Sequence, residues 1–286
     1  MVITRAAIVA ALSTIAIGIA ACNSDRAYAP PDTVLTDRQV STDVVVSEGE
    51  AVAADLVSLD ESANISGGVF SVNSGDDAPS VRNNMAPSST ASSTSCTYAS
   101  GRWSCMPAAQ NGVTIVRSYT YFDGSGQPMY RYDALKTASI NHQLTMNGTI
   151  ARDTTFSGVV HRARSVTVSG LLGAETTRRW DGAGTSADTN THRDSRGTRR
   201  YAGNSADSLK AVVYLQPRTP GSYPLSGSTV RIVSYTVTLS GKSSEIRSVD
   251  RRVVATYNGT ALAKIQTGTV TCTLHLDTHR VDGCSG

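Results

Sequence analysis

The sequence contains none of the short motifs that mark common enzyme classes. It has no Gly-x-Ser-x-Gly, no His-Glu-x-x-His, no Walker loop and no Gly-x-Gly-x-x-Gly opening a helix. The five histidines are scattered, and carboxylates are scarce after residue 95. These absences favour a non-enzymatic protein. Catalytic triads are recognised by geometry rather than by order in the chain, so an exported hydrolase stays open as an alternative.

Long apolar runs are also scarce. The run from residue 6 to residue 21 has 16 residues, which is too few to span a bilayer as a permanent helix. The basic Arg5, the apolar middle and the small residues at the end are typical of a secretory signal peptide. We therefore expect residues 1–21 to be a signal peptide.

A cysteine follows this run directly, and Ile19-Ala20-Ala21-Cys22 resembles the lipobox of bacterial lipoproteins. The resemblance implies cleavage before Cys22, diacylglycerol on its sulfur and acylation of the new amino terminus. Several acyl chains anchor a protein stably, whereas one is marginal at about 0.8 kcal/mol per buried CH₂. The expected partner is thus the membrane of a bacterial cell envelope, and Asn23, where an aspartate would suggest inner-membrane retention, favours the outer membrane. The alternative is a chance cysteine after an ordinary signal.

No Cys-x-x-Cys pair is present, which argues against a zinc site. With Cys22 acylated, four cysteines remain, and disulfides persist in exported compartments. Four cysteines allow three connectivities, between which the sequence does not decide. The spacing favours two local loops, Cys96–Cys105 and Cys272–Cys284.

Charge is divided unevenly along the chain. Residues 23–95 carry 11 acidic and 3 basic residues, a net charge of −8, whereas residues 96–286 carry 12 acidic and 22 basic residues, a net charge of +10. We expect residues 22–95 to form an acidic tether and residues 96–286 to form one globular domain.

One short helix is expected in the tether, over about residues 48–60. Ser47 and Glu50 have the spacing of a capping box, and Val52, Leu56 and Leu59 form an apolar stripe. We expect this helix to dock on the globular domain, with binding to a partner as the alternative.

The globular region is rich in Thr, Val, Ser and Tyr and lacks helical patterns of ten residues, which argues against a parallel α/β sheet. Apolar and polar residues alternate in several segments, as in Val233, Tyr235, Val237 and Leu239. Turn signals such as Asn147-Gly148 separate the segments. The sequence predicts an all-β fold: an antiparallel β-meander of about nine or ten strands, closed as a sandwich or flattened barrel.

The segment RSYTYFDGSGQPMYRYD predicts a hairpin that is rich in tyrosine. A symmetric turn would place Tyr121 opposite Tyr130 and Tyr119 opposite Tyr132, all on one face. Such a row of rings either stacks a sugar or another flat ligand, or packs in the core.

The segment THRDSRGTRR is the most basic part of the globular region and contains Arg193, Arg196, Arg199 and Arg200. Guanidinium groups suit phosphate and carboxylate, so an anionic lipid headgroup or an acidic glycan is a candidate ligand. Pairing with the acidic tether is the alternative. Specific nucleic-acid recognition is not predicted.

HLDTH is the most metal-like cluster. His275, Asp277 and His279 share one face of a strand, but the outer two are about 13 Å apart, too far to share one ion. We expect a solvated face and no metal or other cofactor. DGAGTSAD, at 181–188, lacks the ligand pattern of a calcium loop and is expected to be an exposed loop.

These observations lead to one main hypothesis and two alternatives. The main hypothesis is an envelope-anchored binding or scaffolding module without enzymatic activity, whose ligand is anionic or a glycan. The alternatives are an exported hydrolase and a carrier that holds an apolar ligand in the cavity of a β-barrel.

Overall fold

The computed structural model describes residues 35–66, 96–110, 112–151, 156–173, 175–194, 197–216, 222–241 and 244–286. All of them belong to one compact unit, Thr33–Gly286. The expected signal peptide, Cys22 and Arg196 lie outside the described residues.

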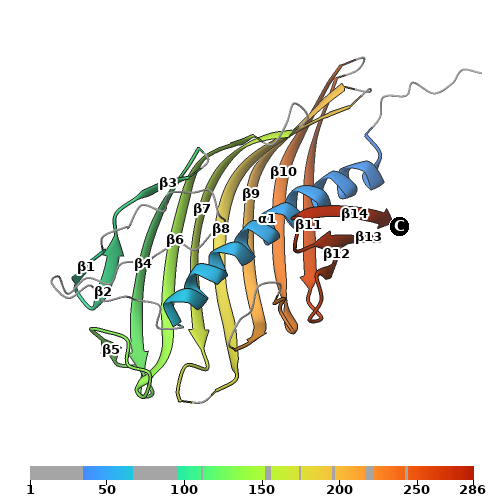
Figure 1. The fold of residues 1–286 in the computed structure, drawn as a ribbon. Coiled ribbons are helices and arrows are strands. Elements are labelled where there is room, and N and C mark those ends of the chain that lie inside the picture. Colours follow the sequence, from blue (N-terminus) through green and yellow to red (C-terminus); the bar gives the residue numbers. More distant parts are fainter. Residues whose placement is uncertain are drawn as a thin grey trace, which may run out of the picture. The chain divides into compact units, whose positions relative to one another are not determined.

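The prediction of an antiparallel all-β fold is confirmed, because the described residues form an open sheet of 14 strands with one helix (Figure 1). Four strands, β1, β2, β3 and β5, have only two to four residues, so alternation could not reveal them, and the expected nine or ten strands were too few. The strands are β1 (Cys96–Ala99), β2 (Arg102–Cys105), β3 (Ala108–Gln110), β4 (Val113–Asp123), β5 (Pro128–Met129), β6 (Thr137–Ala151), β7 (Phe156–Ser169), β8 (Thr177–Asp194), β9 (Gly197–Leu215), β10 (Ser226–Gly241), β11 (Glu245–Thr256), β12 (Leu262–Thr267), β13 (Val270–His275) and β14 (Arg280–Ser285).

The strands follow one another across the sheet almost in chain order, which is the topology of a meander. The order is β1-β2-β4-β6-β7-β8-β9-β10-β11-β12-β13-β14, and β3 and β5 pair with β4. The long strands β6 to β11 therefore have two ends. At the end that we call the upper end, β6, β8 and β10 finish and β7, β9 and β11 begin (Figure 1). The turns between β7 and β8, β9 and β10, and β11 and β12 lie at the lower end.

Alternation along the strands gives the sheet two distinct faces. In β10 the predicted apolar set of Val233, Tyr235, Val237 and Leu239 is buried, whereas Ile232 is 58% exposed. We call the side of Val233 and Tyr235 the inner face and the side of Ile232 the outer face. Cross-strand register carries the outer row of Ile232 through Ala206, Thr185 and Ala163 to Thr145.

The helix α1 (Asp37–Ser66) lies on the inner face and is much longer than the expected range 48–60. Its amino terminus is capped by Thr36, whose hydroxyl accepts a hydrogen bond from the backbone N–H of Gln39 at 3.1 Å. Ser47 and Glu50, the expected capping box, are therefore in the middle of the helix.

Residues on several sides of α1 are buried. Its sequence therefore carries no clear amphipathic stripe. One side contacts β7 to β11 through hydrogen bonds that are described below. Another side meets β12 to β14 so closely that a Cβ added at Gly49 would lie 2.4 Å from Val281 Cγ2 and 3.1 Å from Ile265 Cδ1. Glycine at this position allows the helix and the last strands to approach each other. In the described part of the chain, no helix is long and apolar enough to cross a membrane.

Both predicted disulfides are confirmed. Cys96–Cys105 joins β1 to β2, and Cys272–Cys284 joins β13 to β14. Each closes one hairpin near an end of the sheet, where few other strands hold the chain.

Candidate functional site

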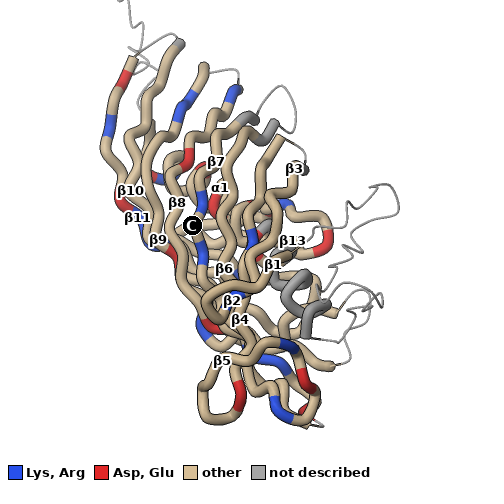
Figure 2. Tube along the Cα trace, turned by 90° about the vertical axis from the view of Figure 1, so that its left-hand side faces the viewer, with Lys and Arg blue, Asp and Glu red and all other residues tan. Residues whose placement is uncertain are grey.

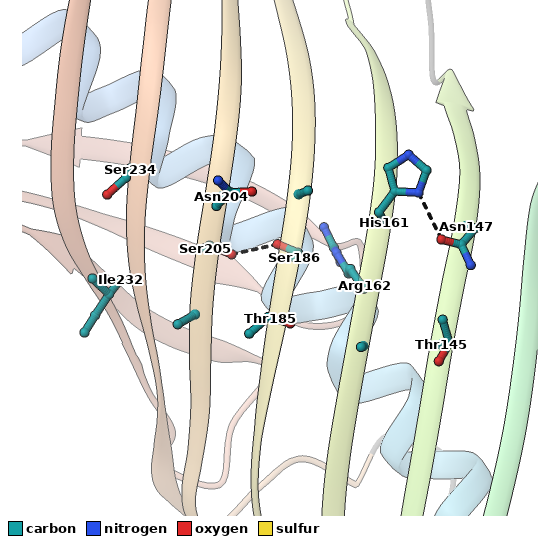
Figure 3. A pocket seen from close by; sticks show the side chains of 13 residues that line it. Thr145, Asn147, His161, Arg162, Thr185, Ser186, Asn204, Ser205, Ile232 and Ser234 are labelled. Carbon is teal, nitrogen blue, oxygen red and sulfur yellow. Dashed lines mark hydrogen bonds between the residues drawn. The ribbon is translucent and has the colours of Figure 1, made fainter.

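A hollow on the outer face is the largest surface site that we describe. It has a volume of about 640 Å³ and extends over β6 to β10 (Figure 3). We call it the outer hollow. Its lining residues are Thr145, Asn147, His161, Arg162, Ala163, Thr185, Ser186, Ala187, Asn204, Ser205, Ala206, Ile232 and Ser234.

Small side chains make the floor of the outer hollow, since Ala163, Ala187 and Ala206 come from three adjacent strands. Polar side chains without a formal charge stand around this floor. His161 Nδ1 and Asn147 Oδ1 are 2.9 Å apart, and Asn204 lies in the same cross-strand row on the other side of Ala187. The surface therefore offers amide, imidazole and hydroxyl groups, which donate and accept hydrogen bonds.

A smaller hollow of about 420 Å³ continues this surface and shares Thr145, Ala163 and Thr185 with the outer hollow. Its other outward-facing residues include Gln143, Ser165 and Ala183, one cross-strand row closer to the lower end. The two hollows form a trough along the outer face. Uncharged polar and small side chains face outwards along both parts of it.

The inner face of the same strands carries charge instead. Seven charged residues meet there between α1 and the sheet, and we call them the inner charge cluster. They are Glu48, Asp55, Arg162, Arg164, Asp188, Asp207 and Arg231.

Arg231 is at the centre of the inner charge cluster, with a side chain that is 0% exposed. It donates to Glu48 through Nε and to Asp55 through Nη1 at 3.2 Å. Arg164 donates to Asp55 and, at 2.7 Å, to Asp207. Because a buried charge is costly without a partner, these contacts hold α1 against β7 and β10.

The inner charge cluster contains four carboxylates and three guanidinium groups. Burial raises the pKa of Asp207 above its ordinary value, although the nearby Arg164 opposes this shift. The neutral form of Asp207 would balance the charges of the cluster. Burial also raises the pKa of Tyr235, with a further contribution from Glu48, so its hydroxyl remains a donor to Glu48.

Two further acidic residues of α1 bind arginines of the sheet. Asp43 accepts from Arg199 Nε at 2.6 Å and from the hydroxyl of Tyr201. Asp37, at the start of the helix, accepts from Arg247 and Arg251. The acidic residues of α1 therefore pair with arginines of the sheet. This pairing is the alternative that the sequence analysis gave to binding of an anionic ligand.

The arginines of THRDSRGTRR are consequently divided between two environments. Arg199 is 6% exposed and paired with Asp43, whereas Arg193 and Arg200 are exposed. Arg196 lies outside the described residues. The segment does not place all its described arginines on one surface.

The tyrosines of the predicted hairpin form part of the core rather than a row of exposed rings. Tyr119 and Tyr121 are each 1% exposed, and Tyr132 is partly buried. The register differs by one residue from the symmetric turn, since Tyr121 pairs with Met129. Tyr130 is 47% exposed and contacts the ring of Trp103 at a centroid distance of 5.3 Å.

The strand predicted over HLDTH ends at His275, and Asp277 and His279 lie in the turn that follows, so the three residues do not share one face of a strand. His275 Nε2 lies 3.1 Å from Asp282 of β14, and Asp277 is exposed in the turn that follows β13. Among the described residues, no three His, Cys, Asp or Glu side chains form a group that could hold a metal ion.

The segment 181–188, which was expected to be an exposed loop, is instead the middle of β8. The prediction was wrong because its Gly and Asp residues are turn formers by composition. In the structure Gly182 and Gly184 leave room for neighbouring backbone and for Asp207, and Asp188 joins the inner charge cluster.

A serine and a histidine meet where α1 crosses β8. Ser47 Oγ lies 2.9 Å from His192 Nε2, and Asp43 lies one helical turn before Ser47. Burial lowers the pKa of His192, which favours the neutral imidazole. A nucleophile must be reached by its substrate, however, and Ser47 is only 7% exposed. We therefore interpret this pair as one more contact that holds the helix.

Sequence reasoning missed the outer hollow because its residues are alanine, serine, threonine and asparagine, which are common on any strand. A signal for the inner charge cluster did exist. The alternation through Val233 and Tyr235, continued by two residues, places Arg231 on the buried face.

Comparison with known proteins gives no match to a protein-family model, to a curated protein or to a solved structure.

Proposed function

We propose that this chain is a lipid-anchored binding module of a bacterial cell envelope and that it holds an uncharged glycan in the outer hollow. The lipobox-like Ile19-Ala20-Ala21-Cys22 supports the anchor and the location. The observation that carries the ligand class is the lining of the outer hollow: hydroxyl, amide and imidazole groups around a floor of alanines.

The chemistry of the outer hollow suits sugar hydroxyls better than anions. A sugar hydroxyl both donates and accepts, and so do the side chains of Thr145, Asn147, Asn204 and Ser234. Ile232, which is 58% exposed, offers an apolar surface for the C–H groups of a sugar ring.

The one cationic residue of the lining is engaged elsewhere. Arg162 approaches Asp55 at 3.6 Å and Asp188 at 3.5 Å on the inner face. Asp250 lies beside the hollow and accepts a hydrogen bond from Ser234. Exposed Arg252, which pairs with Ile232 across β10 and β11, borders the hollow as well, so its edge carries one charge of each sign. Arg162, the cation of the lining itself, is paired on the inner face, which favours an uncharged glycan over the anionic alternative.

The inner face supports neither a carrier nor a hydrolase. On the inner face, where an apolar ligand would have to lie, the described residues of α1 pack against the sheet through apolar contacts and the inner charge cluster. The Ser47–His192 pair is buried. A binding module that uses its outer face is consistent with both observations.

The experiment that tests this proposal fills the outer hollow. Ala187→Trp places a large side chain on its floor, at an exposed strand position where a bulky residue is tolerated. Binding of the mature protein to an array of uncharged oligosaccharides should fall by at least about tenfold, which corresponds to about 1.4 kcal/mol.

Ser248→Trp is the matched control, because Ser248 is also exposed and lies in the cross-strand row of Thr236, outside the hollow. It should leave binding unchanged. Equal losses in both variants, or binding to acidic glycans alone, would contradict the proposal.

A further inference from the structure

The described chain begins at the upper end of the sheet. The backbone N–H of Leu35 donates to Glu245 at 3.1 Å, and its carbonyl accepts from Arg247 at 3.0 Å. Glu245 is the first residue of β11, directly after the turn from β10. The connection towards Cys22 therefore starts at this end.

This connection is short compared with the sheet. Leu35 follows Cys22 by 13 residues, which span at most about 45 Å when fully extended. Leu239, which pairs with Glu245, and Leu225 at the lower end are 14 residues apart along the chain, or about 47 Å. If the lower end faced the membrane, the connection from Leu35 to Cys22 would have to be fully extended to reach the lipid. If the upper end faced the membrane, a less extended connection would be long enough.

The two ends also differ in charge. The upper end comprises the described residues of 35–43, 149–160, 191–201 and 237–248, and its described side chains include five cations and three anions. They are Arg38, Arg193, Arg199, Arg200 and Arg247 against Asp37, Asp43 and Glu245. The lower end comprises the described residues of 123–137, 169–181, 213–226 and 256–262, with four of each sign. They are Arg131, Lys136, Arg178 and Arg179 against Asp123, Asp133, Glu175 and Asp181. Figure 2 marks these charges along the chain.

Two arginines and an isoleucine of the upper end are free to meet a surface. Arg200, Thr238 and Ile246 lie in one cross-strand row of the outer face, and Arg193 lies one row nearer the turns. Ile246 is 72% exposed. Neither Arg193 nor Arg200 forms an ion pair with a residue that the structure describes.

The lower end has exposed apolar side chains of its own, namely Leu135, Leu172, Leu215, Leu225 and Leu262. Backbone hydrogen bonds join its turns, as between Gly259 and Pro224 at 2.7 Å. This row of leucines is the alternative membrane-facing surface, and it is the end that the short connection disfavours.

We infer that the upper end rests on a membrane surface rich in anionic phospholipid, with Arg193 and Arg200 at the headgroup phosphates and Ile246 at the interface. This inference rests on the lipid anchor of the proposed function. Guanidinium pairs with phosphate in a bidentate geometry, and each cation near an anionic bilayer strengthens contact by about fivefold. Contact between the upper end and the membrane would hold the sheet upright on the bilayer. The trough on the outer face would then open sideways, away from the lipid.

The test uses the mature, acylated protein in vesicles with and without anionic phosphatidylglycerol. Ile246→Cys and the matched lower-end variant Leu262→Cys, 47% exposed in the unsubstituted chain, each supply one free thiol for an environment-sensitive fluorophore. The other cysteines are in the two disulfides or expected to be acylated. Quenching by lipids brominated near the interface should affect the label at 246 and not the label at 262.

Replacing both Arg193 and Arg200 by Gln should reduce this quenching by more than about tenfold, and vesicles without phosphatidylglycerol should show little of it. Equal quenching of the two labels, or stronger quenching at 262, would overturn the inference. The mass of the amino-terminal peptide distinguishes a failure of the membrane contact from a failure of the lipid anchor. An acylated peptide with an unquenched label 246 refutes the contact alone, whereas a peptide without acyl chains refutes the anchor and the contact together.

Discussion

The two faces of the central strands reverse the usual distribution of charge. On β7, Arg162 and Arg164 point to the inner face, whereas His161, Ala163 and Ser165 point outwards. On β9, Asp207 is buried and Asn204 and Ala206 line the outer hollow. The inner face bears charge because α1 supplies carboxylates to match it, whereas the outward-facing side chains of the outer hollow carry no formal charge. A strand can therefore bury its charged residues when a partner element provides the counter-charges.

The largest effect should come from breaking the centre of the inner charge cluster. Arg231→Met leaves Glu48 and Asp55 buried beside fewer cations, so we expect a loss of about 3–5 kcal/mol in the free energy of unfolding. Arg252→Met is the control, because Arg252 is exposed and lies opposite Ile232 on the outer face. Urea unfolding of both variants measures the difference. Equal, small losses would show that the buried charges do not hold the helix.

The histidines of the two faces should differ in their effect on the pH dependence of the free energy of unfolding. Burial lowers the pKa of His142 from 6.5 to about 3, with Arg117 and Arg102 adding to the shift, while Tyr119 stacks on its ring. Below pH 6.5 the unfolded chain binds a proton at His142 that the folded chain does not bind. Stability should fall by about 2 kcal/mol between pH 6.5 and about 4.5 from this residue alone.

His142→Phe should remove that slope, whereas His161→Phe on the outer face should leave it in place. Denaturant unfolding at several pH values gives the result. An unchanged slope in His142→Phe would mean that the imidazole is not buried in its neutral form.

Two carboxylates of the inner charge cluster should respond differently to neutralisation. Asp55→Asn weakens contacts to Arg164 and Arg231 and should cost about 2 kcal/mol at pH 7. Asp207→Asn should cost less, because burial and the neighbouring Asp55 oppose ionisation of this carboxyl and raise its pKa.

A raised pKa also means that the stability contributed by Asp207 is lost as pH rises through its folded value, and Asp207→Asn should remove that loss. Unfolding of both variants at low and neutral pH compares them. A larger cost for Asp207→Asn than for Asp55→Asn at pH 7 would contradict this view of the cluster.

The smallest effect concerns the buried serine. Ser47→Ala removes one hydrogen bond to His192 and should lower stability by about 1 kcal/mol. A fluorophosphonate probe, which labels activated serines, should not react with Ser47 in the folded protein. Labelling at this residue would revive the hydrolase alternative.

The sequence predicted local features well, because they depend on residues close in the chain. Alternation placed Val233 and Tyr235 on the buried face, and spacing selected both disulfides. The length of α1 could not be predicted in this way. Its acidic residues resemble a solvated tether until the arginines of distant strands are placed beside them, and burial on several sides removes the helical apolar stripe.

Sites that depend on cross-strand assembly were the hardest to predict. The hairpin that pairs Tyr121 with Met129 turns at Asp123, whose backbone N–H donates to the carbonyl of Gln127 at 3.0 Å, and its register differs by one residue from a symmetric turn. The floor of the outer hollow requires three alanines from three successive strands, β7, β8 and β9, in matching register. Each of these residues is unremarkable in its own segment, and only the register of the sheet brings them together.

The salt dependence of glycan binding tests the central claim most directly. If the uncharged side chains of the outer hollow bind an uncharged glycan, the dissociation constant should stay the same from low to high salt, because no ion pair is screened. A binding constant that weakens steeply with salt would contradict the account, since it would place the ligand on the arginines instead of in the outer hollow.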